Sequence, residues 1–221
     1  MANQRENILS TATELFYEQG YNNTYFYQIA DALNVTKPLI SYYFKSKSLL
    51  AKEVSDKFTI GNKNTIAFKL YNHYFNCIEK QYDLQLSTAI EIRLSEMLCF
   101  IDPKAARFVQ ESNKDNYEIL FISHYKDLYK IHDRQYHLNI NHKNDEISML
   151  ARGAIAATTA IRLGYLNDEF SCTMSECLDY ITTVHFRFMR VDEKRIAELV
   201  KMSAEIIDAI GFEFNPYFKI E

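Results

Sequence analysis

The sequence predicts an all-α fold, with a small three-helix domain at residues 1–47 and a larger helical domain at residues 48–221. Apolar residues recur at intervals of three and four along most of the chain, which is the spacing of amphipathic helices. Hydrophobic residues make up 48% of the chain and charged residues 24%, as in ordinary globular proteins. There are only 5 glycines and 3 prolines. Only Gly153 lies within a helical pattern. The other glycines fall at or near the end of one, where they favour termination: Gly20, Gly61, Gly164 and Gly211.

The first helix is expected over residues 4–19, with Gly20 as its stop. Two short helices joined by a tight turn follow between Phe26 and Phe44. Asn34 stands in the turn, where positive φ is often required and Asn tolerates it. Thr36 is placed to cap the second helix of the pair, and Pro38 falls in its first turn, where a missing N–H costs little.

The outward face of that second helix has the chemistry of a nucleic-acid reader. It carries Lys37, Leu39, Ser41, Tyr42 and Tyr43, and from Thr36 to Lys47 there are lysines and no acid. A short helix can enter the DNA major groove, while Lys, Tyr and Thr donors bond the flanking phosphates. The alternative is a helical hairpin whose edge is basic by accident.

A connecting helix, capped by Ser46 or Ser48, is expected to end near Gly61. Amphipathic patterns then run over residues 67–78 and 86–101, Pro103 interrupts, and a short helix passes through Ala106 and Val109. Another apolar stripe covers residues 117–131, and residues 137–144 read as a loop. A final helix ends at Gly211, and the tail after it has no clear periodicity.

Two strong helical patterns precede the last helix, at residues 147–165 and 174–188. The first is rich in small residues, which let helix axes approach closely, so the two suit a packed pair. Two copies of the pair would form a four-helix bundle across a twofold axis. Two buried helices within a monomer are the competing interpretation.

An ordered set of residues between Arg5 and Leu50 resembles the tetracycline-repressor (TetR) family of bacterial regulators. The set comprises Leu15-Phe16, Gly20-Tyr21, Thr24, Ile29-Ala30, Val35-Thr36-Lys37 and the run from Tyr42 to Leu50. The resemblance implies an all-α homodimer, with an N-terminal DNA-binding domain and a C-terminal domain that binds a small effector and dimerises. By position, Thr36 and Lys37 match residues that contact DNA, Tyr42 a phosphate-binding tyrosine, and Lys47 a lysine that anchors the DNA backbone. The sequence departs from the family pattern at Tyr25, Phe26, Asn34, Pro38, Leu39, Ser41 and Tyr43.

The resemblance also directs attention to an aromatic-rich segment and to the last two major helices. Aromatic walls suit a small apolar or planar effector, and the expected lining is Tyr71, Phe75, Met97, Phe100, Phe121, His124 and Tyr125. For any one of these side chains, ordinary core packing is the alternative. The expected dimer interface is Ile147, Ala151, Ala154, Thr158, Leu178, Ile181 and His185.

Composition and motifs argue against several other classes. A net charge of −4 does not suit a protein that coats nucleic acid by bulk charge, although a local basic site remains compatible with it. The sequence has no catalytic motif, no Cys-x-x-Cys pair and no apolar run of membrane-spanning length. Asp133 and His137 lie four residues apart but have no further ligand at a recognisable spacing, so no metal and no cofactor are expected. A cytoplasmic, non-enzymatic protein is the simplest expectation.

Two functional hypotheses follow. The first is a homodimeric transcriptional repressor that a small effector releases from a palindromic operator. The second is a helical ligand-binding or catalytic protein whose N-terminal domain no longer binds DNA. Salt-dependent affinity for DNA distinguishes them.

Overall fold

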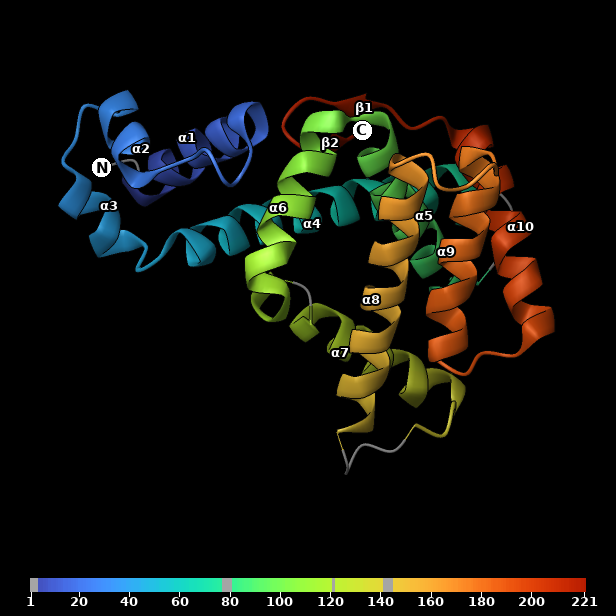
Figure 1. Cartoon of the computed structure of the whole chain (residues 1–221). Coiled ribbons are helices and arrows are strands. Elements are labelled where there is room, and N and C mark those ends of the chain that lie inside the picture. Colours follow the sequence, from blue (N-terminus) through green and yellow to red (C-terminus); the bar gives the residue numbers. More distant parts are fainter. Residues whose placement is uncertain (1–3, 77–80, 121, 141–144) are drawn as a thin grey trace.

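The computed structural model describes residues 4–76, 81–120, 122–140 and 145–221, without the side chains of residues 113–124. This part of the chain is almost entirely helical, as predicted (Figure 1). Its elements are α1 (Gln4–Gln19), α2 (Phe26–Ala32), α3 (Lys37–Tyr43), α4 (Lys47–Leu70), a π-helical turn η1 (Tyr71–Phe75), α5 (Leu84–Ile101), α6 (Pro103–Leu120), α7 (Ile122–Tyr136), α8 (Glu146–Leu166), α9 (Met174–Phe188), α10 (Glu193–Ile210), β1 (Phe214–Asn215) and β2 (Lys219–Ile220).

The first three helices follow the sequence closely. α1 ends at Gln19, and Gly20 adopts φ +84°, a conformation that glycine takes without steric cost. Asn34 has φ 51° in the turn between α2 and α3, and the Val35 N–H donates to the carbonyl of Ala30 at 2.9 Å. Thr36 is the N-cap of α3, but its side chain makes no capping hydrogen bond. The expected side-chain cap at Thr36 is therefore wrong, although its place at the helix start is right.

Helix α4 is longer than expected because it does not end at Gly61. Ser46 caps its start by accepting a hydrogen bond from the Leu49 N–H at 3.1 Å. The helix then runs through Gly61 to Leu70, and Ile66 and Leu70 are buried in the C-terminal core. A glycine inside a helix costs only about 1 kcal/mol, which burial of these two side chains outweighs.

The middle of the chain is divided differently from the expectation. Pro103 begins α6 instead of merely interrupting, since Asp102 Oδ1 accepts hydrogen bonds from the N–H groups of Lys104 and Ala105. α6 is consequently a long helix reaching Leu120, and α7 begins at Ile122. The expected single stripe over residues 117–131 spans the end of one helix and the start of the next. Apolar periodicity continues across both helices and does not mark their boundary.

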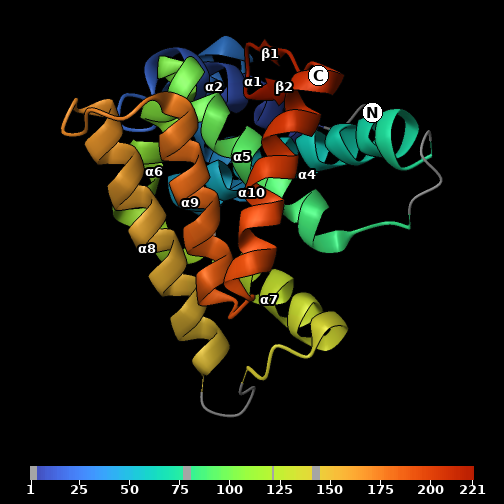
Figure 2. The same ribbon diagram turned by 90° about the vertical axis from the view of Figure 1, so that its right-hand side faces the viewer.

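Helix α5 forms the centre of the C-terminal domain. It packs against α4, α6, α9 and α10, and most of its residues are buried. α8 and α9 lie side by side, with α10 beyond α9 (Figure 2). Within the described residues, no helix combines the length and hydrophobicity needed to cross a lipid bilayer.

The tail, for which the sequence showed no periodicity, forms a short hairpin. β1 and β2 pair antiparallel, with Phe214 opposite Ile220 and Asn215 opposite Lys219. Phe218 at the turn is fully buried in a cluster that includes the α1–α3 core, Leu98 of α5 and Phe108 of α6. The hairpin thus belongs to the packing between the N-terminal helices and the rest of the molecule.

Candidate nucleic-acid interface and ligand cavity

Helix α3 presents the side chains that the sequence assigned to DNA. Its inner residue Ile40 is fully buried against α2. On the outside, Thr36, Lys37 and Tyr42 are exposed, and Tyr42 exposes 70% of its surface. The remaining predicted α3 residues are half-buried: Leu39, Ser41 and Tyr43. An exposed helix bearing Lys, Thr and Tyr donors has the form needed to contact phosphates and base edges.

Lys47 lies at the first residue of α4, against the turn that follows α1. Its Nζ donates to the carbonyl of Tyr21 at 2.9 Å and to that of Asn22 at 3.4 Å. The same ammonium lies 4.4 Å from the centre of the Tyr21 ring and 5.1 Å from that of Tyr25. These contacts fix a half-exposed cation at the edge of the α3 surface.

An exposed pair of tyrosines extends this surface. Tyr25 and Tyr27, at the start of α2, stack with ring centres 5.8 Å apart and expose 49% and 53% of their surface. Tyr27 was not predicted to belong to the interface. The signal that could have indicated Tyr27 is an aromatic residue that lies off the apolar face of a short helix.

Helix α6 holds the end of α1. The Arg107 guanidinium donates to the carbonyls of Tyr17 at 3.2 Å and Glu18 at 2.8 Å. The carboxylate of Glu111 accepts from the Asn22 N–H at 2.8 Å. The turn that bonds Lys47 on one side is therefore bonded to the C-terminal domain on the other.

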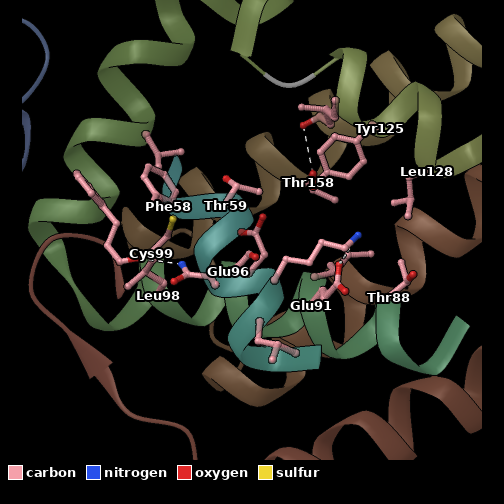
Figure 3. A pocket seen from close by; sticks show the side chains of 18 of the residues that line it. Phe58, Thr59, Thr88, Glu91, Glu96, Leu98, Cys99, Tyr125, Leu128 and Thr158 are labelled. Atoms are coloured by element: carbon pink, nitrogen blue, oxygen red, sulfur yellow. Dashed lines mark hydrogen bonds and ion pairs between the residues drawn. The ribbon is translucent and has the colours of Figure 1, made fainter. Parts of the chain in front are cut away.

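A cavity of about 190 Å³ lies between α4, α5, α7 and α8. Figure 3 shows Phe58 and Cys99 at one end and Tyr125 and Leu128 at the other, with Glu96 between them. Four threonines also line it: Thr59, Thr88, Thr158 and Thr159. Oγ1 of Thr159 is buried without a hydrogen-bond partner among the described residues. The cavity combines aromatic walls with polar groups, as ligand sites do.

A bidentate ion pair forms one wall of the cavity. Arg162 Nε and Nη2 donate to the Glu96 carboxylate at 2.6 and 3.1 Å, and both side chains are nearly buried. Burial lowers the pKa of Arg162, but the Glu96 carboxylate outweighs this effect and holds the pKa above its usual value. Lys63 and Glu91 form a second pair at 3.5 Å, and burial raises the pKa of Glu91. Burial also raises the pKa of Cys99 to about 11, which keeps that thiol protonated and unreactive at neutral pH.

His185 supports Tyr125 from behind. The two rings stack nearly parallel, at 8°, with centres 5.1 Å apart. Burial, and then the positive charge of Arg162, lower the pKa of His185 to about 4. The imidazole is therefore neutral at physiological pH and acts as a packing element.

The expected pocket residues are placed in several environments. Tyr125 lines the cavity, whereas Tyr71 is 60% exposed and Phe75 is buried in the core. Met97 and Phe100 are half-buried against the same core. Phe121 and the side chain of His124 lie outside the described residues. The sequence analysis did not identify the cavity walls formed by α4 and α8. Glu96 and Arg162, which are opposite charges inside apolar patterns, could have indicated a buried ion pair there.

The expected dimer residues all point into their own chain. Each is at most 5% exposed in the single chain: Ile147, Ala151, Ala154, Thr158, Leu178, Ile181 and His185. They pack α8 and α9 onto each other and onto the core, so this face is not available to a second copy. The other faces of these helices are open, with Met149 60% and Tyr180 55% exposed, and Ala156 and Ala160 also exposed.

The described residues contain no cluster of three His, Cys, Asp or Glu side chains that would hold a metal ion. Asp133, one of the two spaced residues noted in the sequence, accepts a hydrogen bond from the Ile140 N–H at 3.0 Å. It serves the backbone at the end of α7.

Comparison with known proteins places these features in a family. Residues 8–54 match the family model of bacterial regulatory proteins of the tetR family. Its N-terminal domain is therefore a helix-turn-helix domain of the tetR type. A domain of this type is the DNA-binding part of bacterial transcription regulators, which supports a DNA-binding regulator.

Solved structures share the architecture of the chain at low sequence identity. RolR, crystallised without ligand, superimposes with a TM-score of 0.56 at 14% identity, over 90% of this chain and 96% of RolR. A structure described as the molecular basis for control of antibiotic production by bacterial hormones gives a TM-score of 0.50 at 16% identity, over 85% of this chain and 98% of the other. At these identities the likeness concerns the fold. No curated protein matches the chain in sequence.

Proposed function

We propose that this protein is a homodimeric repressor of the TetR family that binds a palindromic operator and is released by a small apolar or aromatic effector in the cavity. One observation carries the proposal: α4 bears Lys47 at its start and Phe58, Thr59 and Lys63 on the cavity wall. Lys47 and Phe58 are separated by roughly 16 Å of helix. A rigid helix that touches both sites can couple them, and a coupling of about 1–3 kcal/mol is sufficient for regulation.

DNA binding is the first part to test. We would measure fluorescence anisotropy with DNA from upstream of the protein's own gene and with a randomised pool, at several salt concentrations. Tyr42→Phe, Lys37→Ala and Lys47→Ala should each weaken binding, and each lysine change should reduce the salt slope by roughly one unit if that lysine contacts one phosphate. Lys201→Ala, on the exposed side of α10, is the matched control and should bind as the wild type does.

Because Lys47 also bonds the Tyr21 and Asn22 carbonyls, its variant needs a thermal melt alongside the titration. A folded wild type without salt-dependent affinity for either DNA would contradict the repressor proposal. It would favour the alternative of a helical ligand-binding or catalytic protein with a non-functional head.

The open faces of α8 and α9 are the proposed dimer surface. Ala156 and Ala160 leave room for close helix approach, and Met149 and Tyr180 supply apolar area. Ala156→Glu should convert the dimer to a monomer in sedimentation velocity, because it buries two like charges in a twofold interface. Lys201→Glu, a charge change on α10, should leave the dimer intact. A monomeric wild type at micromolar concentration would refute this surface.

The effector should be small. The cavity lies below the roughly 300–1,000 Å³ of sites for drug-sized ligands. Thermal shifts against single-ring aromatic and short apolar compounds would find it, since a ligand at a hundred times its Kd stabilises the fold by about 2.7 kcal/mol. Thr159→Phe, which fills the cavity, should abolish the shift, whereas Lys201→Phe on the exposed side of α10 should keep it. A shift that survives Thr159→Phe would place the ligand elsewhere.

A further inference from the structure

The C-terminal hairpin has little means of holding itself together. β1 and β2 pair over two residues each, and two further bonds join the backbones of Glu213 and Glu221. Tyr217 and Phe218 in its turn have φ 64° and 66°, the left-handed region that bulky side chains rarely adopt. A two-stranded hairpin is marginal in water by itself. Its conformation must therefore be maintained by contacts with the helices.

Phe218 makes ring contacts with three different helices. Its ring lies 4.7 Å from that of Phe58 on α4, 5.0 Å from Phe108 on α6 and 5.3 Å from Tyr17 on α1. Phe218 is fully buried. Phe218 thus packs between the head and the C-terminal domain, and Figure 1 shows the hairpin that carries it running between these two parts.

Asn62 of α4 fixes the hairpin backbone in this position. Its Nδ2 donates to the Phe218 carbonyl at 2.8 Å, and its Oδ1 accepts from the Ile220 N–H at 3.0 Å. One amide therefore satisfies a backbone acceptor and a backbone donor on either side of Lys219. This pair of bonds sets the depth at which Phe218 enters the helices.

The same ring also borders the cavity. Phe58, Asn62 and Phe218 all belong to its lining, whereas Tyr17, which meets Phe218 edge to face, belongs to the α1 core. A ligand that fills the cavity presses on the Phe58–Phe218 stack, and the far side of that stack is α1. Packed interiors transmit such displacements because they have no free volume to absorb them.

We propose that the hairpin at residues 214–220 is a relay between the cavity and the DNA-binding head, with Phe218 as the side chain that passes a change in the cavity wall to α1. This rests on the proposed role of the cavity as an effector site. The relay differs from the coupling along α4 because Phe218 contacts α1 directly.

Hydrogen–deuterium exchange of the full chain tests the relay without DNA or effector. Phe218→Ala and Asn62→Ala should make the α1 amides exchange on the order of tenfold faster, while α8 and α9 keep their protection. Phe186→Ala removes an equally buried ring from the C-terminal core and should not act selectively on α1. Lys219→Ala, an exposed hairpin change, should exchange as the wild type does.

A double-mutant cycle tests the link to the cavity. Phe58→Leu alters the cavity wall and should speed α1 exchange in the wild-type background, but add little in the Phe218→Ala background. Independent effects of the two changes would overturn the relay. The relay would also be overturned if the α1 amides of both Phe218→Ala and Asn62→Ala exchanged at the wild-type rate. If Phe218→Ala does not fold, Asn62→Ala alone decides the test. Failure of DNA binding would leave these outcomes unchanged, so the two proposals fail separately.

Discussion

Replacing Glu96 by Gln tests the electrostatics of the cavity wall. The wild-type carboxylate pairs with Arg162 at 2.6 and 3.1 Å, with side-chain exposures of 10% and 11%. Removing one charge leaves the other buried without compensation, which costs roughly 3–5 kcal/mol in proteins. Because both side chains border a cavity that water can enter, we expect the lower end, about 3 kcal/mol. At about 2–4 °C per kcal/mol for a chain of this size, the melting temperature should fall by roughly 6–12 °C.

Urea unfolding followed by far-UV circular dichroism measures this change. Glu205→Gln is the matched control, because the Lys201–Glu205 pair is 3.9 Å long and its side chains are 77% and 64% exposed. We expect that control to change stability by about 0.5 kcal/mol or less. The double variant Glu96→Leu with Arg162→Met removes both charges and should recover most of the lost stability. A Glu96→Gln protein within about 1 kcal/mol of wild type, or a double variant as unstable as the single one, would refute this reasoning.

Three further substitutions test local features. His185 has a pKa of about 4 in the folded chain and 6.5 in the unfolded chain, so between pH 7 and pH 5 the unfolded chain takes up a proton that the folded chain does not. This uptake lowers the free energy of unfolding by about 2 kcal/mol. His185→Phe should remove that part of the pH-dependent loss of stability in urea titrations at the two pH values. Gly61→Ala should stabilise the protein by about 0.5–1 kcal/mol in thermal melts, because the added Cβ meets nothing within 4 Å in the α4 interior; a destabilised variant would contradict the continuous helix. Gly20→Ala should destabilise by more than Gly61→Ala stabilises, since φ is +84° and the Cβ would lie 2.6 Å from Glu111 Oε2; equal stability of this variant and wild type would contradict the left-handed turn at the end of α1.

The parts of the fold that could be predicted are those fixed by local stereochemistry. Gly20, Asn34 and Gly211 end their helices as expected, and all three have positive φ. The expected helix end at Gly61 was wrong because the helix continues in order to bury Ile66 and Leu70, whose contacts involve residues distant in sequence. Local signals locate helix ends, but they do not reveal when tertiary contacts carry a helix past a weak position.

The hairpin and the cavity depend even more on distant contacts. Phe218 packs against rings from α1, α4 and α6, and no periodic pattern near residue 218 predicts these contacts. The cavity brings Phe58, Glu96 and Arg162 together from three helices. Aromatic residues were a poor guide to it because Phe75 serves ordinary core packing and Tyr71 is exposed. Buried opposite charges are better guides, since each requires a partner.

The burial of the expected dimer residues has a physical cause that applies to any amphipathic helix. The strongest apolar stripe of α8, which contains Ile147, Ala151 and Ala154, packs within the chain. A chain must bury such a stripe in order to fold, whereas a dimer face needs only moderate hydrophobicity and a shape that permits close approach. Ala156 and Ala160 meet that second requirement on the opposite side. On such a helix the most hydrophobic face therefore indicates the core, and we propose that the partner binds the opposite face, which carries the small residues.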